Sequence, residues 1–249
     1  MADLQSVQDI KALARKCLRS FYWPALLVCM VIIGFTGVSA VFSGFGNHQV
    51  FRAVQVIVLA VLLQFFIVGP LLVGQAYFFL RSIDGDVKVS NLFVAFHLPH
   101  YWNIAVISTK IFLRILLSFV IPVFILGFHA SGIGVFITLL LFIPGIMLIY
   151  RYRLIPFVLA NDLQMPFHKV LGFCDSIAIH RLRRLIFFID LSFAGWYILG
   201  LLAFGIGAFF VVPFHQSSMA TLYNDMKELV YGHVQKVEGT YMAESEGDQ

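Results

Sequence analysis

The sequence has few charged residues and few cysteines. Charged residues make up only 12% of the 249 positions, whereas apolar residues make up 60%, and the mean hydropathy is +0.91. Because a soluble globular protein carries about 25% charged residues, this composition excludes an ordinary soluble domain. The three cysteines, Cys17, Cys29 and Cys174, form no CxxC pair. We therefore expect free thiols and not a disulfide framework.

The sequence also lacks the motifs of common catalytic and cofactor sites. His97 and His100 offer two imidazoles, but no cysteine or third histidine lies near them, so we expect no metal site. Ser192 has no histidine beside it. The glycine pairs at 44–46 and 205–207 lack the strand and the lysine of a phosphate-binding loop. We therefore predict no catalytic residues, no cofactor and no metal, and a protein that is not an enzyme.

Long apolar runs are abundant instead. A bilayer core of about 30 Å takes about 20 apolar residues of helix, and such runs occupy residues 21–43, 52–80, 103–128, 133–150 and 185–212. The last run would reach about 42 Å at a rise of about 1.5 Å per residue, too long for one ordinary span. It is interrupted at Gly205-Ile206-Gly207. Dividing the run there predicts six transmembrane helices.

The basic residues are distributed as a six-span protein requires. With the N-terminus in the cytoplasm, nearly all Lys and Arg residues fall on or near the inner side, and Arg52 falls outside. The predicted outer turns near 44–50, 129–132 and 204–206 hold no Lys, Arg, Asp or Glu. Because cytoplasmic loops carry an excess of Lys and Arg, we place both termini in the cytoplasm. The net charge of +4 then reflects topology and contact with anionic lipid headgroups, not nucleic-acid binding.

Three prolines, Pro70, Pro144 and Pro213, are spaced by 74 and 69 residues and mark similar units. Each unit has an amphipathic cytoplasmic segment, an outgoing helix, a short outer turn and a long returning helix that contains the proline. The units cover about 1–83, 84–162 and 163–236 within one membrane domain, 1–236. We predict an all-α polytopic membrane helix bundle of three tandem hairpins, kinked at these prolines. Coincidence is the alternative, since proline is frequent in transmembrane helices.

The predicted amphipathic segments are residues 4–19, 87–99 and 166–183. In the first, an apolar face opposes basic residues, as is typical of a helix that lies among lipid headgroups. This face consists of Ile10, Leu13, Ala14 and Cys17. Residues 237–249 are acidic and almost without apolar side chains, so we predict a disordered tail.

Polar residues within the apolar runs are the candidate functional residues, because ionisable groups in hydrocarbon are costly. Asp190 is one, and it is expected to pair with Lys110 or Arg114, either as a proton or ion relay or as a structural pair. Snorkelling of these two basic side chains to the headgroups is the alternative.

Amides and a histidine form a second group of candidates beside the prolines. His215 and Gln216 follow Pro213, while Gln64 and Gln75 flank Pro70. Such groups either line a polar cavity or repair the hydrogen bonds lost at a kink. Their recurrence beside prolines favours a shared interior surface.

The stretch from Asp190 to Trp196, followed by Gly205-Ile206-Gly207, Pro213 and Tyr223, resembles a bacterial membrane family known as domain of unknown function 975. Gly69–Gly74 and Pro144-Gly145 add to the likeness, which covers most of residues 60–226. The chain departs from the family pattern at Pro213-Phe214, where Pro-Tyr is common, and at His180-Arg181, where a glycine is common. The resemblance implies a multipass protein of a bacterial cell (inner) membrane without an assigned activity, and it supplies no catalytic residues. A looser likeness is to the membrane domains of some glycerophosphodiester phosphodiesterases.

Two functions follow from these observations. The first is a non-enzymatic protein that organises the membrane or binds a membrane-protein partner or lipids, with anionic headgroups on the cytoplasmic side. The alternative is a small transporter or permease subunit with its site among the proline-kinked helices, since interrupted helices at related positions mark such sites.

Overall fold

The computed structural model describes residues 7–42, 49–97, 100–128, 132–177, 180–202, 207 and 209–227. These residues form helices and turns and include no strand. The predicted all-helical class is therefore confirmed. The elements are α1 (Val7–Phe42), α2 (Gln49–Leu63), the π-helix η1 (Gln64–Val68), α3 (Gly69–Ile83), the 3-10 helix η2 (Val89–Phe96), α4 (His100–Phe128), α5 (Gly132–Tyr152), α6 (Ile155–Asn161), α7 (Phe167–Ile177) and α8 (His180–Leu202). Residues 209–227 are also helical and are called the C-terminal helix below.

Four of the described segments are long and apolar enough to cross a membrane. They are Val7–Gly34, Ile57–Ile83, His100–Val123 and Thr138–Asn161. Large apolar side chains also cover their outer surfaces, as at Leu117, which is 50% exposed, and Leu139, which is 61% exposed. Helices that are apolar both inside and outside the bundle are typical of membrane proteins. The chain is therefore a membrane protein by composition and helix length.

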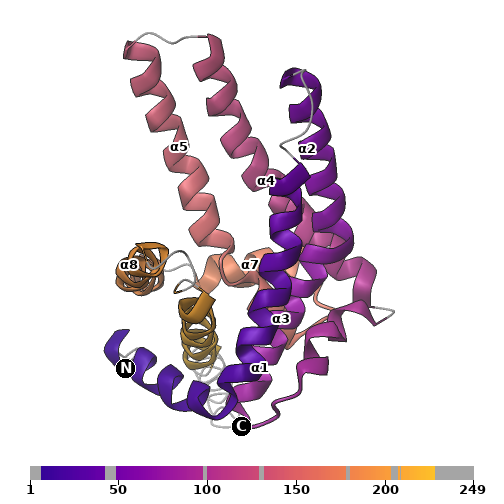
Figure 1. The fold of residues 1–249 in the computed structure, drawn as a ribbon, viewed down its shortest axis with the longest axis vertical. Coiled ribbons are helices and arrows are strands. Elements are labelled where there is room, and N and C mark those ends of the chain that lie inside the picture. The colour runs from indigo at the N-terminus through magenta and orange to yellow at the C-terminus, as the bar shows by residue number, and fades with distance from the viewer. Residues whose placement is uncertain are drawn as a thin grey trace, which may run out of the picture.

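The described helices do not confirm an arrangement of three matching hairpins. Figure 1 shows α2, α4 and α5 running along the long axis of the molecule, with α4 packed beside α5. The same view shows α8 nearly end-on, so the third pair of helices does not repeat the orientation of the first two. The described residues thus leave the six spans and the three similar hairpins unconfirmed. The predicted outer turns and the acidic tail lie almost entirely outside them.

The first helix bends where the sequence divides into an amphipathic segment and an apolar run. Phe21 leaves the helical conformation, with φ −134° and ψ 27°, three residues before Pro24. A proline ring clashes with the carbonyl four residues earlier, so a break just before Pro24 is expected physically. Figure 1 shows the segment before the bend crossing the base of the molecule. We call residues 7–20 the N-terminal arm.

The apolar face of the N-terminal arm is used mainly inside the protein. Ile10 and Ala14 are fully buried, whereas Leu13 is 39% exposed. The Ser217 hydroxyl of the C-terminal helix donates a hydrogen bond to the Ala14 carbonyl, at 3.3 Å. The face predicted to lie among headgroups is therefore turned largely onto the bundle, because the bend at Phe21 folds the arm back over it.

A π-helical turn precedes Pro70. The Gly69 N–H bonds to the Gln64 carbonyl, five residues back, which widens the helix for one turn. In a regular α-helix the Phe66 carbonyl would accept the N–H of residue 70, but Pro70 has none. The Phe66 carbonyl accepts a hydrogen bond from the Tyr101 hydroxyl instead, at 3.1 Å. By contrast, α5 continues through Pro144, and the C-terminal helix is helical on both sides of Pro213.

The core lies where α1, α3, η2 and α6 meet. Phe21, Phe78 and Phe79 are buried and pack edge to face, with ring centroids 5.4 to 6.5 Å apart. A side chain at Gly74 would collide with the Leu92 carbonyl oxygen, so η2 lies directly against α3. The predicted amphipathic segment 87–99 is thus mostly a 3-10 helix held by this close approach.

Candidate functional site

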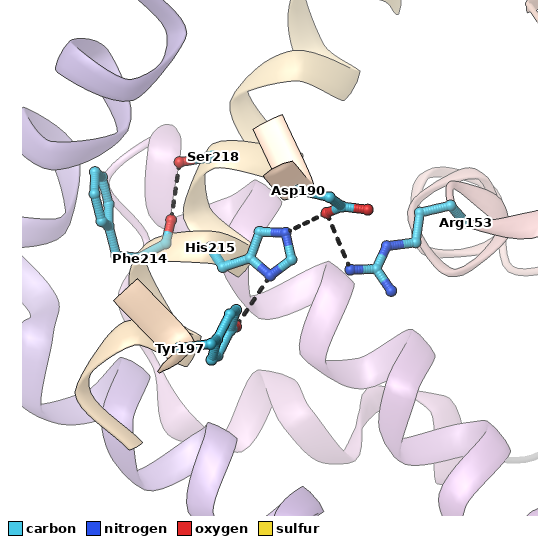
Figure 2. Close-up of polar contacts among 6 residues, drawn as sticks. All are labelled: Arg153, Asp190, Tyr197, Phe214, His215 and Ser218. Atoms are coloured by element: carbon cyan, nitrogen blue, oxygen red, sulfur yellow. Dashed lines mark hydrogen bonds and ion pairs between the residues drawn. The ribbon is translucent and has the colours of Figure 1, made fainter. Parts of the chain in front are cut away.

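Four polar side chains from three elements meet beside the C-terminal helix. Asp190 and Tyr197 are seven residues apart on α8, so they lie on one face two turns apart. His215 follows Pro213 on the C-terminal helix, and Arg153 lies in the turn between α5 and α6. Figure 2 shows these side chains converging. We call Arg153, Asp190, Tyr197 and His215 the polar cluster.

The polar cluster is a continuous chain of contacts. The Tyr197 hydroxyl lies 3.1 Å from His215 Nδ1, and His215 Nε2 lies 2.7 Å from Asp190 Oδ1. The same carboxylate oxygen lies 3.5 Å from Arg153 Nη2. Asp190 therefore has a short contact to the histidine and a long one to the arginine.

For the neutral form of His215, one arrangement of the protons satisfies all of these contacts. A neutral imidazole has one N–H donor and one nitrogen acceptor. With the proton on Nε2, His215 donates to Asp190, and Nδ1 accepts the Tyr197 hydroxyl proton. Both ring nitrogens are then satisfied, as a side chain only 6% exposed requires.

The N-terminal arm closes over the polar cluster. The Phe193 ring lies 4.9 Å from the His215 ring and is fully buried. Lys11 Nζ donates to the Ser192 hydroxyl at 2.6 Å and lies 4.4 Å over the Phe193 ring. Arg15 lies 5.4 Å over the Phe214 ring. Cations over aromatic faces are attracted by the ring quadrupole, so the arm is held against both helices that carry the cluster.

A cavity of about 280 Å³ lies next to the polar cluster. Its walls come from η1, α3, α4, α6, the end of α5 and the C-terminal helix. The lining brings together Gln64, Gln75 and Gln216, which are separated widely in sequence, and it includes Arg153. The cavity and the polar cluster therefore share one residue, Arg153.

The three amides are placed differently within the cavity wall. Gln75 is 4% exposed and donates to the Cys29 sulfur at 3.3 Å. Gln64 is 9% exposed, and within the described residues neither its amide nor that of Gln216 has a side-chain hydrogen bond. Gln216 is half-buried. Both amides line the cavity and can hydrogen-bond to a molecule that lies in it.

The candidate basic residues of α4 lie elsewhere. Lys110 and Arg114 are exposed, and each lies 5.3 Å over the Phe167 ring at the start of α7. Arg114 also donates to the Tyr152 hydroxyl at 3.4 Å. Neither contacts Asp190, whose basic partners are His215 and Arg153. The pairing expected from the sequence is therefore replaced by one with a different arginine.

Arg153 and Tyr197 are the site residues that sequence reasoning missed. In the sequence, Arg153 is one of the basic residues of the predicted inner side, and it directly follows the helix that contains Pro144. Tyr197 carried a usable signal, because its spacing of seven from Asp190 places both on one helix face. The position of Arg153 depends on how α5 packs near α8, and no local pattern encodes that.

The lining of the cavity combines a few polar side chains with apolar walls. Within the described part of the chain, no group of three or more His, Cys, Asp and Glu side chains could hold a metal ion. The cavity offers a guanidinium and amides, which orient a ligand through hydrogen bonds. Its remaining walls are mostly apolar, as is usual for small-molecule sites.

Comparison with known proteins adds one finding. The model of a family described as a protein of unknown function (DUF975) matches residues 128–230. The predicted resemblance is confirmed over this stretch, which holds all four residues of the polar cluster. The residues around Pro70 that also carried the likeness lie outside it. No curated protein and no solved structure matches the chain, so the looser likeness to glycerophosphodiester phosphodiesterase membrane domains stays a prediction.

Proposed function

We propose that this chain is a multi-pass protein of the bacterial inner membrane that acts by binding a lipid or another amphipathic molecule, and not by catalysis. The observation that carries the proposal is the cavity that gathers Gln64, Gln75, Gln216 and Arg153 within apolar walls. A pocket of this kind is the default binding site of an uncharacterised protein. Organisation of the membrane, or of a membrane-protein partner, would follow from occupancy of this site.

The proposal includes six transmembrane helices in three hairpins, with both termini in the cytoplasm. Four described segments are long and apolar enough to span, and α8 with the C-terminal helix would supply the third pair. Gly207 lies close to Gly200, so that a side chain on it would stand 2.7 Å from the Gly200 Cα. That close approach suits a hairpin whose two helices meet near their turn.

Contact with anionic headgroups is part of the same proposal. Arg15, Lys16 and Arg19 are exposed on the N-terminal arm. A basic segment next to the membrane gains about 1 kcal/mol per Lys or Arg from anionic lipid. This surface would hold the arm at the cytoplasmic interface, and no nucleic-acid partner is needed to account for it.

A matched pair of substitutions on α4 tests the binding function. Ile115 lines the cavity, whereas Leu117 is exposed on the outer surface. The full chain carrying Ile115→Trp or Leu117→Trp would be extracted in mild detergent, and the lipids that accompany it measured by native mass spectrometry. We expect Ile115→Trp to remove a specific bound molecule and Leu117→Trp to retain it. Equal lipid recovery from both well-folded variants and the unchanged protein would contradict the proposal.

The second candidate function is a small transporter or permease subunit. One observation favours it: the cavity lining includes Gln75 beside Pro70, Ile149 after Pro144 and Gln216 after Pro213. Discontinuous helices at the substrate site are typical of secondary transporters, and here the helix of Pro70 has a π-helical turn. Reconstitution of the unchanged protein and of Asp190→Asn in proteoliposomes tests this function. Loss of a measurable flux in a folded variant supports it, and equal flux opposes it.

A further inference from the structure

We propose that the cavity binds an amphipathic oxyanion, a carboxylate or phosphate joined to an apolar chain, with Arg153 as its counter-ion. This inference rests on the proposed binding function and names the class of ligand. Among the described residues that line the cavity, Arg153 is the one charged side chain, and none is Asp or Glu. A cavity with one guanidinium and no carboxylate favours an anion over a cation or a neutral molecule.

Arg153 makes only one long contact within the polar cluster. Its Nη2 atom lies 3.5 Å from Asp190 Oδ1, whereas charge-assisted hydrogen bonds between such groups are about 2.7–2.9 Å long. The same oxygen is held at 2.7 Å by His215. A guanidinium carries five N–H donors in a fixed fork. Donors of Arg153 therefore remain for an oxyanion on the cavity side.

Exchange of one oxyanion for another keeps the charges balanced. Arg153 is partly buried, so its charge is costly there unless it is paired. Asp190 provides the counter-charge when the cavity holds no anion. When a ligand carboxylate or phosphate takes that place, Asp190 still has His215, which Tyr197 supports from the other side. Asp190 is thus the counter-ion of Arg153 when no ligand anion is bound.

The remaining walls fit the two ends of such a ligand. Gln64 and Gln216 have amide groups that can donate to a headgroup oxygen. Phe112 and Ile115 of α4 and Ile149 of α5 are apolar and half-buried, and the cavity that they line is partly open. A volume of 280 Å³ lies near the lower end of ligand pockets, about 300–1,000 Å³. The headgroup and the start of the chain would lie inside, and the rest of the chain would continue into the bilayer.

Matched probes test separately whether the cavity requires the negative charge of the ligand and whether it requires the apolar chain of the ligand. The full-length protein in neutral maltoside detergent would be titrated with dodecanoate, dodecyl phosphate, dodecanol, acetate and inorganic phosphate, with binding measured by calorimetry. We expect the two chain-bearing anions to bind at least about tenfold more tightly than dodecanol, because hydrogen bonds to a charged partner are the strong ones. Acetate and inorganic phosphate would bind more weakly than their dodecyl forms. Equal binding of free phosphate and dodecyl phosphate would overturn the amphipathic part and assign the site to a free anion.

Substitutions then locate the site. Arg153→Gln should weaken dodecanoate binding at least about tenfold, while Arg153→Lys should retain most of it. Arg184→Gln is the control, since Arg184 is an exposed basic residue of α8 outside the lining. Asp190→Asn should strengthen binding, because the competing carboxylate charge is gone while the side chain can still accept from His215. A purely structural role for Asp190 would not produce this gain.

The outcomes separate this inference from the proposed function. If dodecanol binds as well as dodecanoate and Arg153→Gln changes neither, the anion site is wrong, yet the cavity still binds amphipathic molecules. If none of the chain-bearing probes binds and Ile115→Trp alters no lipid recovery, the binding function itself is wrong. Monodisperse gel filtration and an unchanged unfolding midpoint verify that each variant is folded. Should Arg153→Gln not fold, the gain or loss in Asp190→Asn decides.

Discussion

The Tyr101 hydroxyl of α4 donates to the Phe66 carbonyl of η1, across 3.1 Å. Phe66 is the residue whose carbonyl loses its usual partner because Pro70 has no N–H. In hydrocarbon an unsatisfied carbonyl finds no water, so a neighbouring helix must supply the donor. The Tyr101 hydroxyl of α4 thus supplies a donor to the helix that contains Pro70, and this hydrogen bond helps to hold the two helices together.

Removal of this donor should destabilise the protein. Tyr101→Phe is expected to lower the free energy of unfolding by about 1 kcal/mol, the usual net value of one hydrogen bond. Unfolding in a mixture of SDS and neutral detergent would measure it. Tyr150→Phe, a half-buried tyrosine of α5, is the control. In a Pro70→Ala background residue 70 regains its N–H, so Tyr101→Phe should cost less there. An equal cost in both backgrounds would show that the hydroxyl does not compensate for the proline.

The close approach of η2 to α3 gives a second prediction. Gly74→Ala places a methyl group against the Leu92 carbonyl oxygen, which is backbone and cannot swing aside. We expect a loss of about 1–3 kcal/mol in unfolding free energy, the range for overpacking. Gly195→Ala in α8 meets nothing within 4 Å and should be neutral or slightly stabilising. Comparable stabilities of the two variants would contradict the packing of η2.

Some of this fold could be predicted from the sequence because it depends on local chemistry. The long apolar runs predicted the helices, and the change from basic to apolar residues near residue 20 coincides with the bend at Phe21. Pro24, three residues after the bend, is a local signal for it, because proline disfavours a regular helix just before it. Gln64, Gln75 and Gln216 were singled out as polar residues beside prolines, and the structure places all three in one cavity.

The rest depends on tertiary packing that no local pattern encodes. The sequence predicts that Asp190 pairs with Lys110 or Arg114 of α4, because these basic residues lie in an apolar run. The orientation of α8 instead turns Asp190 toward Arg153 and His215. The basic side chains of α4 pack on Phe167, a residue of a separate short helix. Helix periodicity fixes which residues share a face, but it does not fix which neighbour that face meets.

His215 should be the most sensitive residue of the polar cluster. His215→Ala removes both hydrogen bonds at once and leaves Asp190 with one distant partner. We expect a loss of about 2–3 kcal/mol in unfolding free energy, and about 1 kcal/mol for Tyr197→Phe, which removes one bond. The exposed His168→Ala is the control. If His215→Ala behaves like His168→Ala, the contacts of the cluster contribute nothing to stability.

Lys11 should hold the N-terminal arm in place. Lys11→Met removes the hydrogen bond to Ser192 and the cation over Phe193 while keeping a similar side-chain length. We expect faster hydrogen exchange in residues 7–20, because the arm then keeps only its apolar contacts and Arg15. Lys16→Met is the matched control, since Lys16 is exposed on the same arm. Equal exchange in the two variants would mean that Lys11 does not anchor the arm.

The third pair of helices is the part of the proposed topology that needs the sharpest test. A C-terminal reporter distinguishes an odd from an even number of spans, but four and six spans both return the chain to its starting side. The side of the turn after α8 does separate them, because that turn is outside only if α8 crosses the membrane. In a chain whose three cysteines are replaced by serine, Ile206→Cys should react with a membrane-impermeant maleimide added to intact spheroplasts. Lys169→Cys on α7, which is exposed and predicted to be cytoplasmic, should react only after permeabilisation. Labelling of Ile206→Cys only after permeabilisation would leave α8 on the inner side and reduce the protein to four spans.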